Sequence, residues 1–457
     1  MSRRRSRLAR RHAAVLTLAS LMLLVVAAAA LAAGALTQPG GNRGCISEDG
    51  SGPCADGHGL AGGVDAVAVS ADGRSAYATT FSGVARFKRN RHTGAIHQPA
   101  GAAGCVSEGG SGPCADGHGI STSGADSVAV SPDGKSVYVA SFTANTVIRF
   151  KRNTTTGAIH EPAGAAGCVS EDGSGPCADG HGLIGVSWVA VSADGKSVYA
   201  TSTDGNAVVR FKRNRHTGAI HEPAGAAGCV SEDGSGPCAD GHALLDPVWV
   251  APSADGKSLY VASLHSHAVV RLKRNTHTGA IHEPAGAAGC VSNDGSGPCA
   301  DGHALAGPFS IAVSANGRSV YAASTDDNAV VRLKRNGQTG AIHEPAGAAA
   351  CVSEDGSGPC ADGHGLSGAN GVAVTFDGKN VYATSDNAVV RFKRNRHTGA
   401  IHEPAGAAAC VSEDGSGPCA DGRALAGTFN LVVSRDGKSV YTASLDDAAV
   451  AHFERAR

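Results

Sequence analysis

Aromatic residues and methionine are scarce in this chain of 457 residues. Phe, Trp and Tyr together make up 4% of it, and there are only two tryptophans and two methionines. So few rings argue against the stacking platforms that hold oligosaccharides or single-stranded nucleic acid. The sequence has no Gly-x-Ser-x-Gly nucleophile elbow and no EF-hand spacing of acidic residues, and its glycines lie in turns with no helix after them. These absences disfavour serine hydrolases, EF-hand calcium sensors and phosphate-loop proteins.

A strong charge of one sign is also missing. The chain has 39 basic and 40 acidic residues, for a net charge of −1, and six of its arginines lie within residues 1–33. Without that segment the net charge is −7. A nucleic-acid partner is therefore not expected, because binding to the phosphate backbone calls for a basic surface.

Residues 1–33 differ from the rest of the sequence. Their arginines precede an apolar run from Ala13 to Ala33 that ends in small residues. This order is typical of an export signal, so we expect a secreted or cell-surface protein. The apolar run is long for a cleaved signal, and retention as a membrane anchor is the alternative, the one case in which we expect membrane contact.

All fourteen cysteines form pairs with eight residues between the members. The pairs are Cys45 and Cys54, Cys105 and Cys114, Cys168 and Cys177, Cys229 and Cys238, Cys290 and Cys299, Cys351 and Cys360, and Cys410 and Cys419. An even number, a fixed spacing and an export signal together predict seven local disulfides. Zinc is the competing interpretation, since a histidine such as His58 follows the second cysteine, but a tetrahedral site would lack one ligand.

A unit of about sixty residues occurs seven times, with one tyrosine in each copy. It contains four short runs rich in Val, Ile, Tyr and Phe, bounded by turn formers such as Asp-Gly and Thr-Gly, which predicts a meander of four antiparallel strands. One such sheet cannot bury both faces, so the copies must stack on one another. A cysteine-bracketed loop then leads to the next copy.

The two chain ends predict a closed ring. The last copy stops after its third strand, whereas residues 34–45 align without a gap with the fourth-strand segment 157–168. Pairing the two ends removes the exposed edges that an open solenoid would leave. We therefore predict an all-β, seven-bladed propeller of four-stranded blades. Residues 34–41 should supply the outer strand of the last blade, and we expect a monomer.

The stretch VAVSPDGKSVYVASFTANTVIRFKRNTTTGAI, residues 128–159, resembles the blades of YVTN-repeat and lactonase-like propellers. That resemblance covers Gly34 to Arg457 and implies seven blades. It also implies that enzymatic members act at the mouth of the central channel with acidic, His and Arg side chains. In this sequence the blades are so alike that no single set of such residues stands out.

Two repeated polar features are candidate sites. Asp-Gly-His follows the second cysteine in six copies, and we expect these histidines near the channel, either as a metal or anion site or as duplicated turn residues. The cysteine-bracketed loop, which we call the stapled loop, contains Ser-Glu-Asp-Gly-Ser-Gly and offers carboxylates to calcium. Turn capping is the alternative role of these carboxylates. No other cofactor is expected.

One sector breaks the repeat. Trp188 and Trp249 occupy equivalent positions in adjacent blades, and the turn between the second and third strands of the fourth blade carries His265 and His267. Together with His181 and His242 they form a candidate ligand site, although large aromatics more often pack. We interpret the protein as a non-catalytic propeller that presents its stapled loops to a protein partner or a small ligand. The alternative is a lactone hydrolase acting on a sugar lactone, with no assigned catalytic residues.

Overall fold

The computed structural model describes residues 32–81, 83–121 and 124–457. Contacts between residues divide the chain into two units, Met1–Ala33 and Gly34–Arg457. The expected export signal or anchor therefore lies almost wholly outside the described residues. Within the described ranges, no helix is long and apolar enough to cross a membrane.

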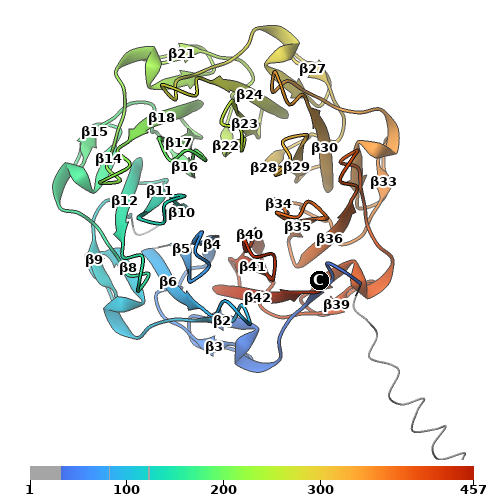
Figure 1. The fold of residues 1–457 in the computed structure, drawn as a ribbon, viewed down its shortest axis with the longest axis horizontal. Helices are drawn as coiled ribbons and strands as arrows, with labels where there is room; N and C mark the ends of the chain where they lie inside the picture. The colour runs from blue at the N-terminus through green and yellow to red at the C-terminus, as the bar shows by residue number, and fades with distance from the viewer. Residues whose placement is uncertain (1–31, 82, 122–123) are drawn as a thin grey trace, which may run out of the picture. The chain divides into compact units, whose positions relative to one another are not determined.

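The unit Gly34–Arg457 is a ring of seven sheets around a central axis (Figure 1). This confirms the predicted all-β, seven-bladed propeller. The innermost strands are β4 (Val64–Val69), β10 (Ala125–Val130), β16 (Val186–Val191), β22 (Pro247–Pro252), β28 (Pro308–Val313), β34 (Gly371–Val374) and β40 (Thr428–Val433). The second strands are β5 (Ser75–Thr80), β11 (Ser136–Ser141), β17 (Ser197–Ser202), β23 (Ser258–Ser263), β29 (Ser319–Ser324), β35 (Asn380–Ser385) and β41 (Ser439–Ser444). The third strands are β6 (Gly83–Arg89), β12 (Thr146–Arg152), β18 (Ala207–Arg213), β24 (Ala268–Arg274), β30 (Ala329–Arg335), β36 (Ala388–Arg394) and β42 (Ala449–Arg455).

The first turn of each blade shows why the repeat keeps its serine, aspartate and glycine. In blade 2, the Ser131 hydroxyl donates to the Asp133 carboxylate at 2.6 Å, and the backbone N–H of Lys135 donates to the same carboxylate at 3.1 Å. Gly134 has a φ of 67°, which an L side chain rarely adopts. The motif thus closes the hairpin between β10 and β11 through its own side chains.

The fourth strand is broken into two pieces that both pair with the third strand. The first pieces are β7 (Ile96–His97), β13 (Ile159–His160), β19 (Ile220–His221), β25 (Ile281–His282), β31 (Ile342–His343), β37 (Ile401–His402) and β1 (Leu36–Thr37). The second pieces are β8 (Cys105–Glu108), β14 (Cys168–Ser170), β20 (Cys229–Ser231), β26 (Cys290–Ser292), β32 (Cys351–Ser353), β38 (Cys410–Ser412) and β2 (Cys45–Ser47). Between the pieces lie the 3₁₀ turns η1 (Gly41–Arg43), η2 (Gly101–Ala103), η3 (Gly164–Ala166), η4 (Gly225–Ala227), η5 (Gly286–Ala288), η6 (Gly347–Ala349) and η7 (Gly406–Ala408).

The stapled loop adds a further strand, so each sheet has six strands where the sequence predicted four. These outermost strands are β3 (Ala55–Asp56), β9 (Ala115–Gly117), β15 (Ala178–Asp179), β21 (Ala239–Asp240), β27 (Ala300–Asp301), β33 (Ala361–Asp362) and β39 (Ala420–Asp421). Proline explains the break in the fourth strand, since Pro162 has no N–H to donate to the ladder. The disulfide explains the added strand, because joining Cys168 to Cys177 holds β15 parallel to β14.

The chain ends close the ring as the sequence predicts. Leu36 and Thr37 of β1 pair with Arg455 and Glu454, and β2 pairs with the same strand, β42. The N-terminal contribution to blade 7 extends beyond residues 34–41, because β2 and β3 complete its sheet. All seven predicted disulfides are formed, each within its own loop. Because the two sulfurs of each cysteine pair are bonded to each other, no pair is left to bind zinc.

A buried polar latch joins each blade to the next, and the tyrosine of the repeat is its centre. Between blades 1 and 2, the Tyr77 hydroxyl donates to the Gly157 carbonyl at 2.6 Å and accepts from Arg152 Nε at 2.6 Å. Arg152 also forms an ion pair of 3.0 Å with Asp72. Apolar clusters lie between neighbouring sheets around the latches, so the core is a series of similar seams rather than one centre.

Candidate functional site

Six of the seven innermost strands carry a β-bulge near their first residue. A bulge re-aims the extra side chain, and bulges are common beside binding and active sites. The bulged residues are half-buried and differ from blade to blade, and we call them the axial site: Asp65, Asp126, Ser187, Val248, Phe309 and Phe429. The inner strand of blade 6, β34, is paired without a bulge.

Two carboxyls in adjacent blades form the acidic half of the axial site. Burial, with the nearby Asp126 carboxyl, raises the pKa of Asp65 to about 7. Burial also raises the pKa of Asp126 to about 6, although the backbone N–H of Phe142 donates to this carboxyl at 2.8 Å. Among the described residues, neither aspartate has an ion pair with a basic side chain. Both carboxyls therefore take up protons at a higher pH than an ordinary aspartate does.

The rest of the axial site is neutral. Ser187 accepts a hydrogen bond from the Thr203 hydroxyl at 2.9 Å. Phe309 and Phe429 meet edge to face, with ring centroids 4.9 Å apart. They come from blades 5 and 7, which are not neighbours, so both rings must reach past blade 6. Asn370 of blade 6 links that blade to blade 7, because its side-chain amide donates to the Thr428 carbonyl at 2.9 Å.

The two tryptophans stack on one another. Their ring centroids are 3.3 Å apart with an interplanar angle of 21°, and Trp249 is only 8% exposed. Both pack against the apolar cluster between blades 4 and 5. The structure thus brings Trp188 and Trp249 together, one residue after the bulge in their strands, where both rings pack between blades.

His265 and His267 of the predicted sector each contact a turn residue. His265 Nδ1 lies 2.6 Å from the Asp246 carboxylate. His267 Nδ1 accepts the backbone N–H of Gly307 at 3.0 Å, in the role that asparagine side chains play in blades 2, 3 and 5. His267 also has a φ of 46°, so this histidine is a turn residue.

His181 and His242 lie on different loops. The backbone N–H of each donates to a glutamate of the following blade, Glu222 and Glu283, at 2.7 Å. His181 lines a cavity of about 430 Å³ with Asp204, Leu245 and the next stapled loop. A cavity of about 350 Å³ recurs at the equivalent position around His364, so it belongs to the repeat rather than to the tryptophan sector.

The Asp-Gly-His steps were expected near the channel, and this placement is wrong. Each step begins within the outermost strand of its sheet, for example at Asp179 in β15, and Figure 1 shows these outermost strands at the rim of the ring. The sequence could not reveal this, because the stapled loop looked like a connection rather than a further strand. No group of three His, Cys, Asp or Glu side chains within residues 32–81, 83–121 and 124–457 is arranged to hold a metal ion.

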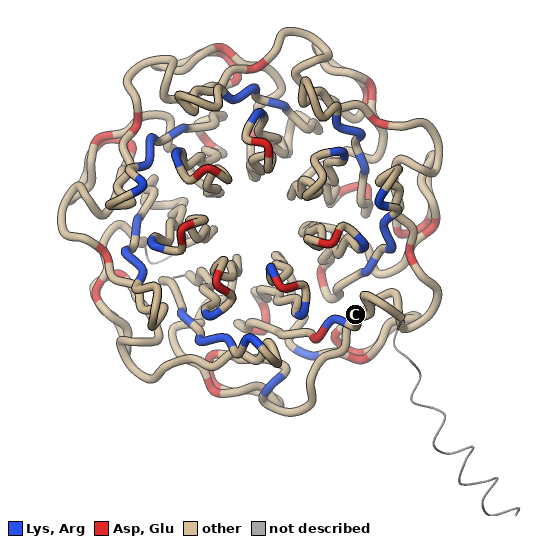
Figure 2. The backbone as a smooth tube through the Cα atoms, in the orientation of Figure 1, with Lys and Arg blue, Asp and Glu red and all other residues tan. Residues whose placement is uncertain are grey.

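Carboxylates of the stapled loops bind backbone groups of those loops. In blade 2, Asp172 accepts the N–H of Ser174 at 3.0 Å, and Glu171 accepts the N–H of Leu183. These contacts are of the turn and capping kind, which is the alternative to calcium binding for these carboxylates. Figure 2 shows acidic segments recurring in the outer loops and an acidic and a basic segment together in the turns nearest the axis.

Sequence reasoning missed the axial site by one position. It compared the blades at Trp188 and its equivalents, whereas the bulged residues stand immediately before them. A detectable signal existed, since the repeat changes there from Asp in blades 1 and 2 to Phe in blades 5 and 7. What the sequence did not show is the bulge at these positions of the innermost strands.

No protein-family model matches this sequence, and no curated protein matches it. Solved structures do resemble it. The periplasmic gluconolactonase of Pseudomonas aeruginosa has a TM-score of 0.52 at 15% identity, over 81% of this chain and 93% of that chain. A candidate 6-phosphogluconolactonase of Bacteroides uniformis has a TM-score of 0.51 at 18% identity, over 74% and 83%.

Hydrazine synthase of Kuenenia stuttgartiensis is similar to the same degree, with a TM-score of 0.50 at 14% identity, over 86% of this chain and 96% of that chain. Sequence identities this low show that the fold is shared, but they do not show that the chemistry is shared. The resemblance seen in the blade sequence is confirmed at that level. This chain is a seven-bladed propeller with the fold of the lactonase-like propellers.

Proposed function

We propose that this protein is an exported binding protein whose axial site takes a small ligand that carries an amine. The observation behind this proposal is the pair Asp65 and Asp126, two partly buried carboxyls in adjacent blades without an ion-pair partner among the described residues, of which Asp126 raises the pKa of Asp65. Carboxyls so placed are unfavourable when ionised unless a cation joins them. A ligand ammonium group would supply that charge.

The neutral half of the axial site suits the rest of such a ligand. Phe309 and Phe429 offer ring surface, and Val248 adds an aliphatic side chain. Aromatic faces attract cations, and apolar groups gain from leaving water. Calcium fits less well, since it takes six to eight oxygen ligands. The axial site thus combines one anionic half with one apolar half.

Lactone hydrolysis is the second candidate, and the same two carboxyls favour it. A carboxyl with a pKa near 7 is suited to general acid or base catalysis. Against this, the other bulged residues are Ser, Val and Phe, and none is a His or Arg that would stabilise the oxyanion of an opening lactone. Binding without turnover is therefore the better supported function.

Export and partner binding are further parts of the proposal. Seven disulfides suit an oxidising compartment outside the cytoplasm. The stapled loops repeat nearly the same sequence around the rim, which gives a protein partner a uniform surface. We propose the rim for such a partner and the axial site for the small ligand.

Tryptophan fluorescence can test the small-ligand proposal, because the only two tryptophans directly follow bulged residues. We expect benzylamine to change the emission at about pH 8 and its neutral analogue benzyl alcohol to do so much less. Asp126→Asn should weaken the response to benzylamine, and Asp179→Asn at the exposed rim should not. An equal response to both compounds would contradict amine recognition. Turnover of gluconolactone that Asp65→Asn abolishes would favour the hydrolase instead.

A further inference from the structure

One seam departs from the repeat at three positions that meet in space. In the first turn of a blade, six copies carry aspartate, and blade 5 carries Asn316. In the turn after the third strand, blade 5 has Gly337 and Gln338, where other blades have Arg or Thr followed by His or Thr. All three residues line one cavity of about 810 Å³ together with His397 and Thr398 of blade 6.

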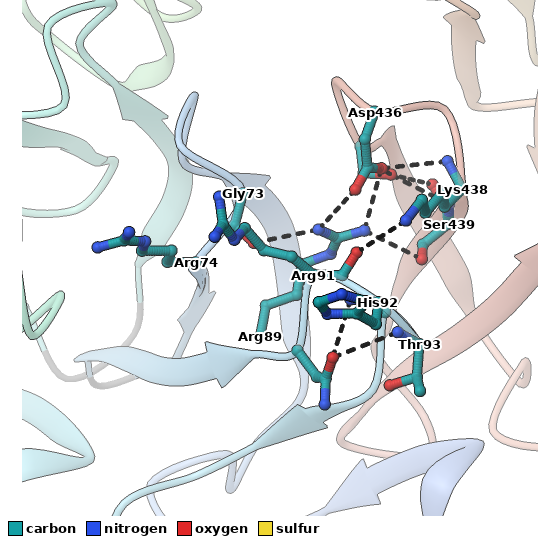
Figure 3. A network of polar contacts seen from close by, with 12 residues as sticks. Gly73, Arg74, Arg89, Arg91, His92, Thr93, Asp436, Lys438 and Ser439 are labelled. Atoms are coloured by element: carbon teal, nitrogen blue, oxygen red, sulfur yellow. Dashed lines mark hydrogen bonds and ion pairs between the residues drawn. The ribbon is translucent and has the colours of Figure 1, made fainter.

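The change to asparagine removes a negative charge from the latch. At the seam between blades 7 and 1, the Arg89 guanidinium forms a fork with the Asp436 carboxylate, with N–O distances of 3.1 and 3.2 Å (Figure 3). Six of the seven seams have such an arginine–aspartate ion pair. In the seventh, Arg394 instead contacts the neutral side chain of Asn316 at 3.4 Å. The buried guanidinium charge there has no carboxylate in its latch.

The wall of this cavity is basic. Arg318, Lys334 and Arg335 line it with two histidines, and among the residues that the structure describes no carboxylate does. Arg335 is already paired with Asp255 at 2.8 Å, so Arg318 and Lys334 supply the charge on the wall, with Arg394 behind Asn316. Like charges gathered without counter-ions raise the local potential and attract an anion.

Gly337 provides the space. A Cβ atom built on it would meet no atom within 4 Å, and its φ is not in the left-handed region. A side chain could therefore stand there without strain, as Arg or Thr does in other blades. Its absence opens the cavity, whose volume of about 810 Å³ is within the range of small-molecule sites.

We propose that this cavity binds a small molecule through a tetrahedral oxyanion, a phosphate or sulfate group. Arginine and lysine are the side chains that recognise such groups, and the amides of Asn316 and Gln338 can donate further hydrogen bonds. The site is separate from the axial site, because the bulges lie at the start of the inner strands and Asn316 lies in the turn after their end. Its ligand is therefore independent of the amine proposed above.

Calorimetric titration of the full chain with pyrophosphate, and separately with sulfate, tests the proposal. Asn316→Asp and Gly337→Thr each install the residue of other blades, so both variants should fold. We expect Asn316→Asp to weaken pyrophosphate binding about tenfold by charge, and Gly337→Thr to weaken it by filling the cavity. The anion that binds with the higher affinity identifies the oxyanion that the cavity favours.

A matched pair of lysines supplies the control. Lys334→Ser should weaken binding several-fold, whereas Lys273→Ser, the equivalent exposed residue one blade earlier, should leave it unchanged. Absence of binding of both anions to the unmodified protein would overturn the proposal. So would equal affinity of the unmodified protein, Asn316→Asp and Lys334→Ser, because the anion would then bind elsewhere.

Discussion

Replacing Asp65 by asparagine should stabilise the ring, and the gain should depend on pH. The rise of the Asp65 pKa from its ordinary 3.8 to about 7 corresponds to roughly 4 kcal/mol at 1.36 kcal/mol per pKa unit. Because the side chain is only partly buried and keeps some contact with solvent, we expect about half of this, ~2 kcal/mol. Asparagine keeps the shape of the side chain and carries no charge, so it avoids this cost.

The sign of the pH dependence follows from proton binding. Between about pH 4 and pH 7, the folded chain keeps a proton on Asp65 that the unfolded chain releases, so the stability of the unmodified protein falls as pH rises. The advantage of Asp65→Asn should be small near pH 4 and complete above about pH 7. Urea unfolding followed by tryptophan fluorescence at several pH values measures this difference.

The exposed rim carboxyl Asp179 provides the control, since Asp179→Asn should change stability little at any pH. If Asp65→Asn gives the same difference at low and high pH, Asp65 is not an ionisable group held in its neutral form. The description of the axial site as a carboxyl pair without a counter-ion would then be wrong.

Three further predictions concern closure, acid stability and the tryptophans. Deleting residues 34–41 removes β1 and the hydrogen bond from Tyr382 to the Gly34 carbonyl, so the thermal midpoint should fall by several degrees; an unchanged midpoint in a monomer would contradict the closure role. Burial lowers the pKa of His452 to about 4, so this residue costs stability as pH falls from about 6.5 toward 4. In urea unfolding, His452→Gln should reduce this loss of stability at acid pH; an unchanged loss would contradict the prediction. Trp249→Ser should lower the free energy of unfolding by about 3 kcal/mol, because the ring is buried, and should leave the affinity of each folded molecule for benzylamine unchanged. A variant that loses affinity but keeps its stability would instead assign Trp249 to ligand binding.

The repeat was sufficient to predict the fold because every blade encodes the same local events. The Asp-Gly turn around Gly134 and the alternating runs on either side define a hairpin without help from the rest of the chain. Closure was also predictable, since Gly34 to Cys45 matches the segment that the last blade lacks. Disulfide pairing followed from the spacing of cysteines such as Cys168 and Cys177.

The added strand and the site depend on contacts that a linear pattern does not display. A disulfide holds the strand β15 against β14, and this pairing across a loop is not visible in the sequence pattern. The sequence therefore predicts a plain connection there and places the following histidines near the axis. The axial site depends on bulges, and a bulge changes which face a side chain takes without changing the sequence period. His267 shows a third limit of sequence reasoning. It stands where other blades have asparagine, so its imidazole suggests a functional role, and only the contact with Gly307 shows that it caps a turn.

Proton release on amine binding tests the central claim most directly. If an ammonium group displaces protons bound to Asp65 and Asp126, calorimetric titration with benzylamine in buffers of different ionisation enthalpy, at about pH 6.5, should show release of up to about one proton from the protein. The affinity should rise with pH as the carboxyls ionise, and the double variant Asp65→Asn, Asp126→Asn should lose both binding and proton release. Binding without proton release, or equal binding by the double variant, would contradict an amine site at the axis.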